Sequence, residues 1–192
     1  MGNAACFARK ARPVLAAALI LSGWSTAAVA VDCADPLTLK PHYGDFAFRQ
    51  TRKLASVPRP LVSEGVARID KGKVVWSVRK PFAVETVITP SGMTQAVNGG
   101  PAKAAGGGTV DPFLRSSGLF QLLTGDYKAL SRYYAISTSK GAAAWRVSLT
   151  PRDKGMARFV SAIEVSGCTA PADVLIRQVN GDLMTIAWLN GG

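Results

Sequence analysis

The chain between residues 45 and 189 is dominated by short segments in which apolar residues occupy every second position. In residues 73–80 these positions are Val74, Trp76 and Val78. The same period recurs in Trp145/Val147/Leu149, Phe159/Ser161/Ile163 and Met184/Ile186/Trp188. A period of two places alternate side chains on one face of a β-strand. The chain is therefore predicted to be mainly β.

Turn signals keep the expected strands short and antiparallel. Lys71-Gly72 and Asn180-Gly181-Asp182 are typical of tight hairpins, and Pro90-Ser91-Gly92 marks a further turn. The Gly-rich stretch 98–108 is expected to be a flexible loop. The expected strands cover residues 45–54, 61–70, 73–80, 84–89, 132–137, 144–150, 158–166, 174–179 and 183–189.

One segment between the two groups of strands has the features of a helix. Asp111 is a good N-cap, Pro112 suits the first helical position, and Thr124-Gly125-Asp126 ends the segment. Gly118 weakens the helix, but its remaining positions are strongly apolar. Many short antiparallel strands with one apolar helix indicate a barrel or a strongly curved sheet wrapped on a helix.

The N-terminus is predicted to be a cleavable signal peptide covering residues 1–30. Three cations, Arg9, Lys10 and Arg12, precede an apolar run over residues 14–21, and Ala28-Val29-Ala30 follows as the cleavage signal. Eight apolar residues are too few to span a bilayer. The working molecule is then a single domain over residues 31–192. A buried N-terminal helix and an uncleaved anchor are the alternatives.

The cysteines fit an exported chain. Cys6 leaves with the signal peptide, so Cys33 and Cys168 remain and are expected to form one disulfide in an oxidising compartment. Two free thiols are the alternative. No metal site is expected, because the chain has one histidine and its cysteines lack C-x-x-C spacing.

The chain is basic without a basic motif. Loss of the three cations of the signal peptide lowers the formal net charge from +11 to +8. The remaining cations are scattered and no block of five occurs, so nucleic acid is not an expected partner. A solvated basic face explains this pattern, and attraction to an anionic membrane surface or an acidic partner is the alternative.

Motifs for catalysis are missing, so no catalytic residue and no cofactor are predicted. The chain has no G-x-S-x-G, and Gly106-Gly107-Gly108 lacks the lysine of a phosphate-binding loop. A hydrolase that uses His42 is kept as a hypothesis. The positive signal is a surplus of apolar residues, which either form a filled core or line a cavity for a hydrophobic ligand.

Several short segments follow one another in a characteristic order: Phe48-Arg49-Gln50, Pro60 to Gly65 with Val75-Trp76 and Pro81, Val87 to Gly92, Pro112-Phe113-Leu114, and Trp145 to Pro151. Their order resembles the outer-membrane lipoprotein carrier (LolA-like) family, and especially its shorter relatives. The resemblance implies a mainly β (α+β) fold: an unclosed antiparallel half-barrel covered by one or more helices, with an apolar cavity. The carriers' Arg-Pro pair before the third strand is absent here, where residues 68–72 read RIDKG.

The resemblance also implies a function. The chain is expected to be a monomeric periplasmic carrier, without enzymatic activity, for a lipid or a lipoprotein acyl chain, between an inner-membrane donor and an outer-membrane acceptor. Val74 and Trp76 match cavity positions of the family. The expected lining is Phe46, Phe48, Val74, Trp76, Val78, Ile88, Phe113, Leu114, Phe120, Trp145, Leu149, Phe159, Ile163, Ile186 and Trp188. The alternative is an envelope assembly factor that binds a protein partner without lipid cargo.

Overall fold

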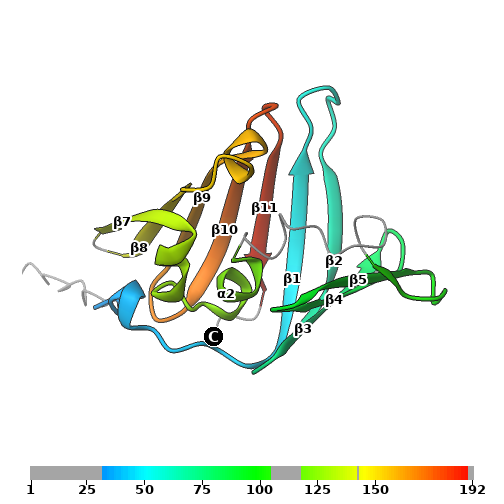
Figure 1. Cartoon of the computed structure of the whole chain (residues 1–192), viewed down its shortest axis with the longest axis horizontal. Helices are drawn as coiled ribbons and strands as arrows, with labels where there is room; N and C mark the ends of the chain where they lie inside the picture. The colour runs from blue at the N-terminus through cyan, green and yellow to red at the C-terminus, as the bar shows by residue number, and fades with distance from the viewer. Residues whose placement is uncertain (1–31, 105–117, 142, 190–192) are drawn as a thin grey trace, which may run out of the picture.

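The fold is one antiparallel sheet that does not close on itself. A computed structural model describes residues 32–104, 118–141 and 143–189, and the predicted signal peptide lies outside these ranges. The described residues form an 11-stranded sheet in the order β6-β5-β4-β3-β2-β1-β11-β10-β9-β8-β7 (Figure 1). The outermost strands, β6 and β7, are not paired with each other. The prediction of a mainly β fold with an unclosed antiparallel half-barrel is confirmed, and the sheet is accompanied by few helices.

The first group of strands follows the chain as consecutive hairpins. Its members are β1 (Gly44–Lys53), β2 (Leu61–Asp70), β3 (Lys73–Lys80), β4 (Val84–Thr89), β5 (Gly92–Val97) and β6 (Lys103–Ala104). The first four match the expected strands to within one residue. Strands β5 and β6 are not among the predicted ones: β5 follows the predicted turn at 90–92, and β6 lies within the stretch expected to be a loop.

The second group is β7 (Tyr134–Lys140), β8 (Trp145–Pro151), β9 (Val160–Gly167), β10 (Pro171–Gln178) and β11 (Leu183–Trp188). The hairpin between β10 and β11 turns at Gly181, whose φ of 87° lies in the left-handed region that favours glycine. Strand β11 pairs with β1, and Phe48 lies opposite Trp188. This pairing joins the first and last strands of the chain and makes both groups one sheet.

The helical segments in the described part of the chain are short. They are η1 (Pro36–Thr38), α2 (Leu119–Thr124), η2 (Ala129–Arg132) and η3 (Met156–Arg158). The last part of the predicted helix is present as α2, which begins after Gly118, a residue with a φ of 62°. The earlier part of the predicted helix lies outside the described residues. Two expected strands begin later than predicted because η2 and η3 occupy their first residues. Within the described residues, no helix has the length and apolar character needed to cross a membrane.

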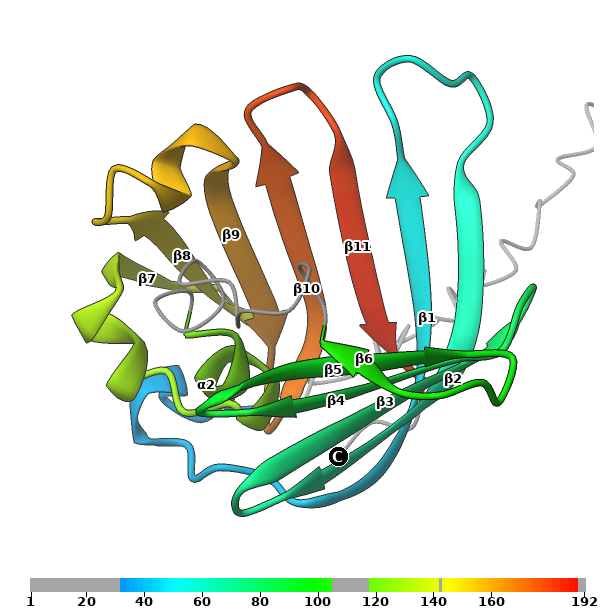
Figure 2. The ribbon, with the colours of Figure 1, turned by 45° about the vertical axis from the view of Figure 1, so that its right-hand side comes forward.

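The sheet bends so strongly that its two groups of strands enclose a concave face. Figure 2 shows β3, β4 and β5 running across the direction of β1, β11 and β10, with α2 inside the bend. The second group is densely filled: Trp145, Val147, Leu149 and Val165 are at most 1% exposed, and they belong to the same core cluster as Tyr127. The filled half leaves the concave face of β1 to β5 as the place where a site can form.

A disulfide holds the N-terminal segment on the filled half. Cys33 is bonded to Cys168 across 135 residues of chain. The Ala34 amide donates to the Cys168 carbonyl at 3.1 Å, and the Trp145 indole N–H donates to the same carbonyl at 2.6 Å. The bridge and these hydrogen bonds attach the start of the described chain to the turn that follows β9.

Candidate functional site

The floor of the concave face is a layer of aromatic side chains from β1, β3 and β11. Phe48 stacks on Trp76 with ring centroids 3.8 Å apart, and Trp188 meets Trp76 edge to face at 5.8 Å. Phe46 extends the layer, 5.9 Å from Trp188. The ring of Phe48 can lie close to β2 because its cross-strand partner there is Gly65, where a Cβ would collide with the ring. The layer forms an apolar base for the concave face, and edge-to-face and stacked pairs of this kind are favourable.

An outer chamber of about 560 Å³ lies against β1 to β5. This volume falls within the range of roughly 300–1,000 Å³ that is typical of small-molecule sites. Three exposed apolar side chains, Leu61, Val62 and Phe82, lie at its border and are 51%, 47% and 69% exposed. The lining residues are Gln50, Arg52, Pro60, Leu61, Val62, Ser63, Trp76, Val78, Pro81, Phe82, Val84, Thr86 and Gln95.

An inner chamber of about 130 Å³ continues the outer one on the side of α2. The two chambers share Gln50, Trp76 and Thr86 as lining residues, so they are adjacent parts of one hollow. The rest of the inner lining is apolar and comes from β4, α2 and β11: Ile88, Leu119, Leu123, Met184 and Ile186. The hollow therefore becomes more apolar toward α2.

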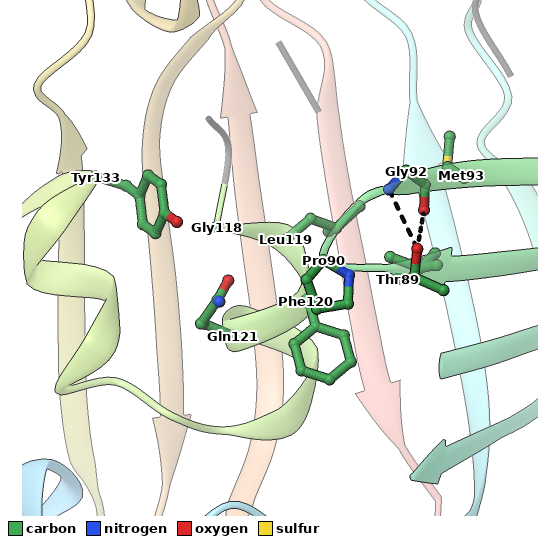
Figure 3. A pocket seen from close by; sticks show the side chains of 10 residues that line it. Thr89, Pro90, Gly92, Met93, Gly118, Leu119, Phe120, Gln121 and Tyr133 are labelled. Atoms are coloured by element: carbon green, nitrogen blue, oxygen red, sulfur yellow. Dashed lines mark hydrogen bonds between the residues drawn. The ribbon is translucent and has the colours of Figure 1, made fainter. Parts of the chain in front are cut away.

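A small end pocket of about 60 Å³ lies where the β4–β5 turn meets α2 (Figure 3). Thr89 closes this turn, because its hydroxyl accepts a hydrogen bond from the Gly92 amide at 3.1 Å and donates to the Gly92 carbonyl at 3.0 Å. Phe120 of α2 lies close to Pro90 in this pocket. The β4–β5 turn and α2 together line this pocket.

The polar side chains of the hollow are sparse, and one of them is charged. The Gln95 amide donates to the Thr86 hydroxyl at 3.2 Å, and both residues line the outer chamber. Arg52 is the charged residue among those that line the three spaces in the described part of the chain. On β1 and β2 the residues that form ion pairs alternate with those that line the hollow. Arg49 and Glu64, for example, form an ion pair at 2.9 Å. Strand alternation places such pairs on the opposite, convex face.

The predicted lining residues fall into several groups. Trp76, Val78, Ile88, Phe120 and Ile186 line one of the spaces. Four others, Phe46, Phe48, Val74 and Trp188, belong to the core or pack against it, and the rings among them form the aromatic floor. Trp145, Leu149 and Ile163 are buried in the filled half. Phe113 and Leu114 lie outside the described residues.

Phe159 differs from the expected alternation. It is 62% exposed, and it precedes β9 with a helical φ of −113° and ψ of −41°. Because η3 ends directly before Phe159, strand β9 begins only at Val160. Phe159 is therefore not part of the strand and does not share the face of Ile163. The expected position of Phe159 in an apolar lining is therefore corrected to an exposed one.

Sequence reasoning missed the polar and border residues of the hollow. Gln50 and Arg52 continue the alternation of Phe46 and Phe48 along β1, so the period of two could have placed them on the concave face. Thr86 stands in the same relation to Ile88. They were passed over because the expected cavity was assumed to be apolar. The exposed border residues Leu61 and Phe82 carry no sequence signal that separates them from ordinary surface positions.

His42 has contacts that give it a structural role. Its ring lies 5.0 Å from Phe46 and 6.3 Å from Trp188, and its backbone amide donates to the Thr124 carbonyl at 2.9 Å. Burial lowers the pKa of His42, partly opposed by a hydrogen bond with the Leu123 backbone. His42 thus joins the segment before β1 to the end of α2. The described residues contain no group of three His, Cys, Asp or Glu side chains that could hold a metal ion.

The fold resembles several solved structures, with low sequence identity and low TM-scores. One is a LolA superfamily protein from Nitrosomonas europaea, with 5% identity, coverage of 81% of this chain and 87% of that chain, and a TM-score of 0.39. Another is a putative outer membrane lipoprotein-sorting protein domain from Vibrio parahaemolyticus, with 12% identity, 78% and 85% coverage and a TM-score of 0.37. A DUF1329 family protein from Desulfovibrio piger has 10% identity, 77% and 85% coverage and a TM-score of 0.40.

Sequence comparison gives the assignment. No curated protein sequence matches the chain. The model of a family described as "Outer membrane lipoprotein carrier protein LolA-like" matches residues 23–186, which is most of the chain. This match confirms the resemblance found from the order of short segments. The protein therefore belongs to the LolA-like family of outer membrane lipoprotein carrier proteins.

Proposed function

We propose that the protein is a periplasmic carrier that binds a lipid or a lipoprotein acyl chain without covalent chemistry and moves it toward the outer membrane. The observation that carries the proposal is the two-part hollow on the concave face, with an outer chamber of about 560 Å³ and an apolar inner chamber. Exposure of an acyl chain to water costs about 0.8 kcal/mol for each CH₂ group. A shielded apolar space removes much of this cost during passage through an aqueous compartment.

The border of the outer chamber supports exchange of cargo. Leu61, Val62 and Phe82 are large apolar side chains that remain exposed beside the opening. Exposed apolar groups gathered at one site are typical of surfaces that receive a ligand, a membrane or a protein. In the proposed function they are the first contact of an acyl chain that leaves a donor at the inner membrane. The same contacts would release it to an acceptor at the outer membrane.

The location and processing follow from the same proposal. Residues 1–30 act as the signal peptide that exports the chain, and the domain from residue 31 works in the periplasm. The disulfide between Cys33 and Cys168 suits an oxidising compartment. The His42 hypothesis loses its motivation, because contacts with the aromatic floor and the end of α2 account for this residue.

The test uses Val78, which lines the outer chamber and is half-buried. A Val78→Asp variant places a carboxylate against the path of the acyl chain and is expected to lose co-purifying lipid, measured by mass spectrometry after periplasmic expression. Ser77→Asp is the matched control, because the neighbouring residue on β3 faces the opposite side of the sheet. It should retain lipid. Trp76 is a poorer choice, since it stacks on Phe48 and its loss would damage the core.

Failure has a clear form. If the wild-type protein contains no lipid and also binds no fluorescent fatty-acid probe in solution, the carrier proposal is wrong. Capture of one defined envelope protein by such lipid-free protein, unchanged by Val78→Asp, would support the alternative of an assembly factor. Equal lipid loss in Val78→Asp and Ser77→Asp would show that the hollow of β1 to β5 is not the binding site.

A further inference from the structure

The two chambers of the hollow differ in chemistry. The inner chamber has five apolar lining residues in addition to the three that it shares with the outer one. The outer chamber adds hydrogen-bonding side chains, among them Ser63 and Gln95, and the guanidinium of Arg52. A ligand that matches this distribution has an alkyl part for the chamber beside α2 and a polar part for the outer one. Such a molecule is an amphiphile, not a plain hydrocarbon.

Arg52 has apolar neighbours and no acidic partner. In the sheet it lies opposite Leu61 on β2 and Met184 on β11. Among the described residues, no ion pair or hydrogen bond of its side chain occurs, whereas Arg49 and Arg68 on the convex face are paired with Glu64 and Asp45. No carboxylate lines the described part of the hollow. The acidic groups near β1 are thus held on the other face, and Arg52 is available to an anion.

Polar groups beside Arg52 can complete a head-group site. Gln50 lies two residues earlier on the same face of β1 and is paired across the sheet with Ser63. Gln95 and Thr86 are hydrogen-bonded to each other on the opposite wall. A planar guanidinium binds phosphate and carboxylate oxygens through two parallel hydrogen bonds, and amide and hydroxyl groups can bind the remaining oxygens.

We propose that the hollow binds an anionic amphiphile, with its negatively charged head group on Arg52 and its alkyl chain directed into the inner chamber past Trp76. The inference rests on the proposed carrier function and adds the chemical class of the cargo. It also assigns Arg52 as a specificity-determining residue. Binding then depends on charge in the head group as well as on the alkyl chain, and it weakens as salt screens the exposed guanidinium.

The experiment compares two lipids with the same acyl chain. The probes are oleoyl lysophosphatidylglycerol, which is anionic, and oleoyl lysophosphatidylcholine, which is zwitterionic, each titrated below its critical micelle concentration against the delipidated protein. The variant is Arg52→Gln. Its matched control is Lys53→Gln, which removes the same charge from the adjacent, exposed residue of β1. Calorimetry gives the dissociation constants at low and at physiological salt.

The wild-type protein should bind the anionic lipid about tenfold more tightly than the zwitterionic one, as expected for one charge-assisted interaction. Arg52→Gln should weaken binding of the anionic lipid more than binding of the zwitterionic lipid, whose phosphate is offset by choline, and so remove the preference. Lys53→Gln should keep the preference. Equal binding of both lipids by the wild-type protein, or equal effects of the two variants, overturns the role of Arg52 but leaves the carrier function standing. If neither lipid binds, the carrier function itself fails.

Discussion

At the scale of single residues, His42 shows how the fold sets a protonation equilibrium. It is the one histidine of the chain, and its half-buried ring lies against Phe46 and Trp188. Burial disfavours the charged imidazolium and lowers the pKa of His42 below its ordinary value of 6.5. In the unfolded chain this cost is absent, so the unfolded state binds a proton more readily than the folded state does.

The consequence is a pH dependence of stability with a defined sign. As pH falls through 6.5 toward the lower pKa of the folded state, the unfolded state takes up more protons and the free energy of unfolding decreases. We expect the wild-type protein to lose stability between pH 7.5 and pH 5.5 in urea denaturation. His42→Gln should show a smaller loss over the same interval. An identical pH dependence in both proteins would contradict the assigned burial of this ring.

At the scale of elements, the close approach of β2 and β3 depends on Gly65. A Cβ at this position would contact the Ser77 carbonyl oxygen and the ring of Phe48. Gly65→Ala should therefore lower the free energy of unfolding by about 1–3 kcal/mol, the range for overpacking a filled site. Gly72 in the turn of the same hairpin is the control, because nothing lies within 4 Å of a Cβ there. Gly72→Ala should change stability by less than about 0.5 kcal/mol, and equal effects would contradict the close approach.

Elements with an apolar period or a strong turn signal could be predicted from the sequence, and elements without them could not. The alternation in β3 and the turn before β11 follow from local chemistry, so their bounds were predicted closely. Strand β5 has the sequence GMTQAV, in which Gln95 faces the hollow, so no apolar period reveals it. The 3-10 turns η2 and η3 are capped locally, because the Asp126 and Asp153 carboxylates accept hydrogen bonds from the Ala129 and Met156 amides. The apolar period does not reveal these turns, so the predicted starts of β7 and β9 lie too early.

At the scale of the whole molecule, the two halves of the sheet are packed unequally. Of the ten largest fully buried side chains, seven lie between Tyr127 and Val165, and the other three are Phe48, Ile69 and Val74. The disulfide also ends on the densely packed side. Local patterns do not reveal this difference, because both halves have the same apolar period, and the strong bend after β2 decides which face stays open. The expected lining consequently mixed residues of the hollow with residues of the filled core.

Unequal packing predicts unequal local stability. Segments with few buried apolar contacts open at lower free energy than a dense core does. In hydrogen exchange followed by mass spectrometry, the amides of β8 and β9 should exchange most slowly, and those of β4 and β5 much faster. Added oleoyl lysophosphatidylglycerol should slow exchange in β3, β4 and β5, because a ligand stabilises the state that binds it, and should leave β8 and β9 unchanged. Uniform protection of both halves in the free protein would contradict the unequal packing. Slowing by the ligand confined to β8 and β9 would place the ligand elsewhere than the hollow beside Trp76.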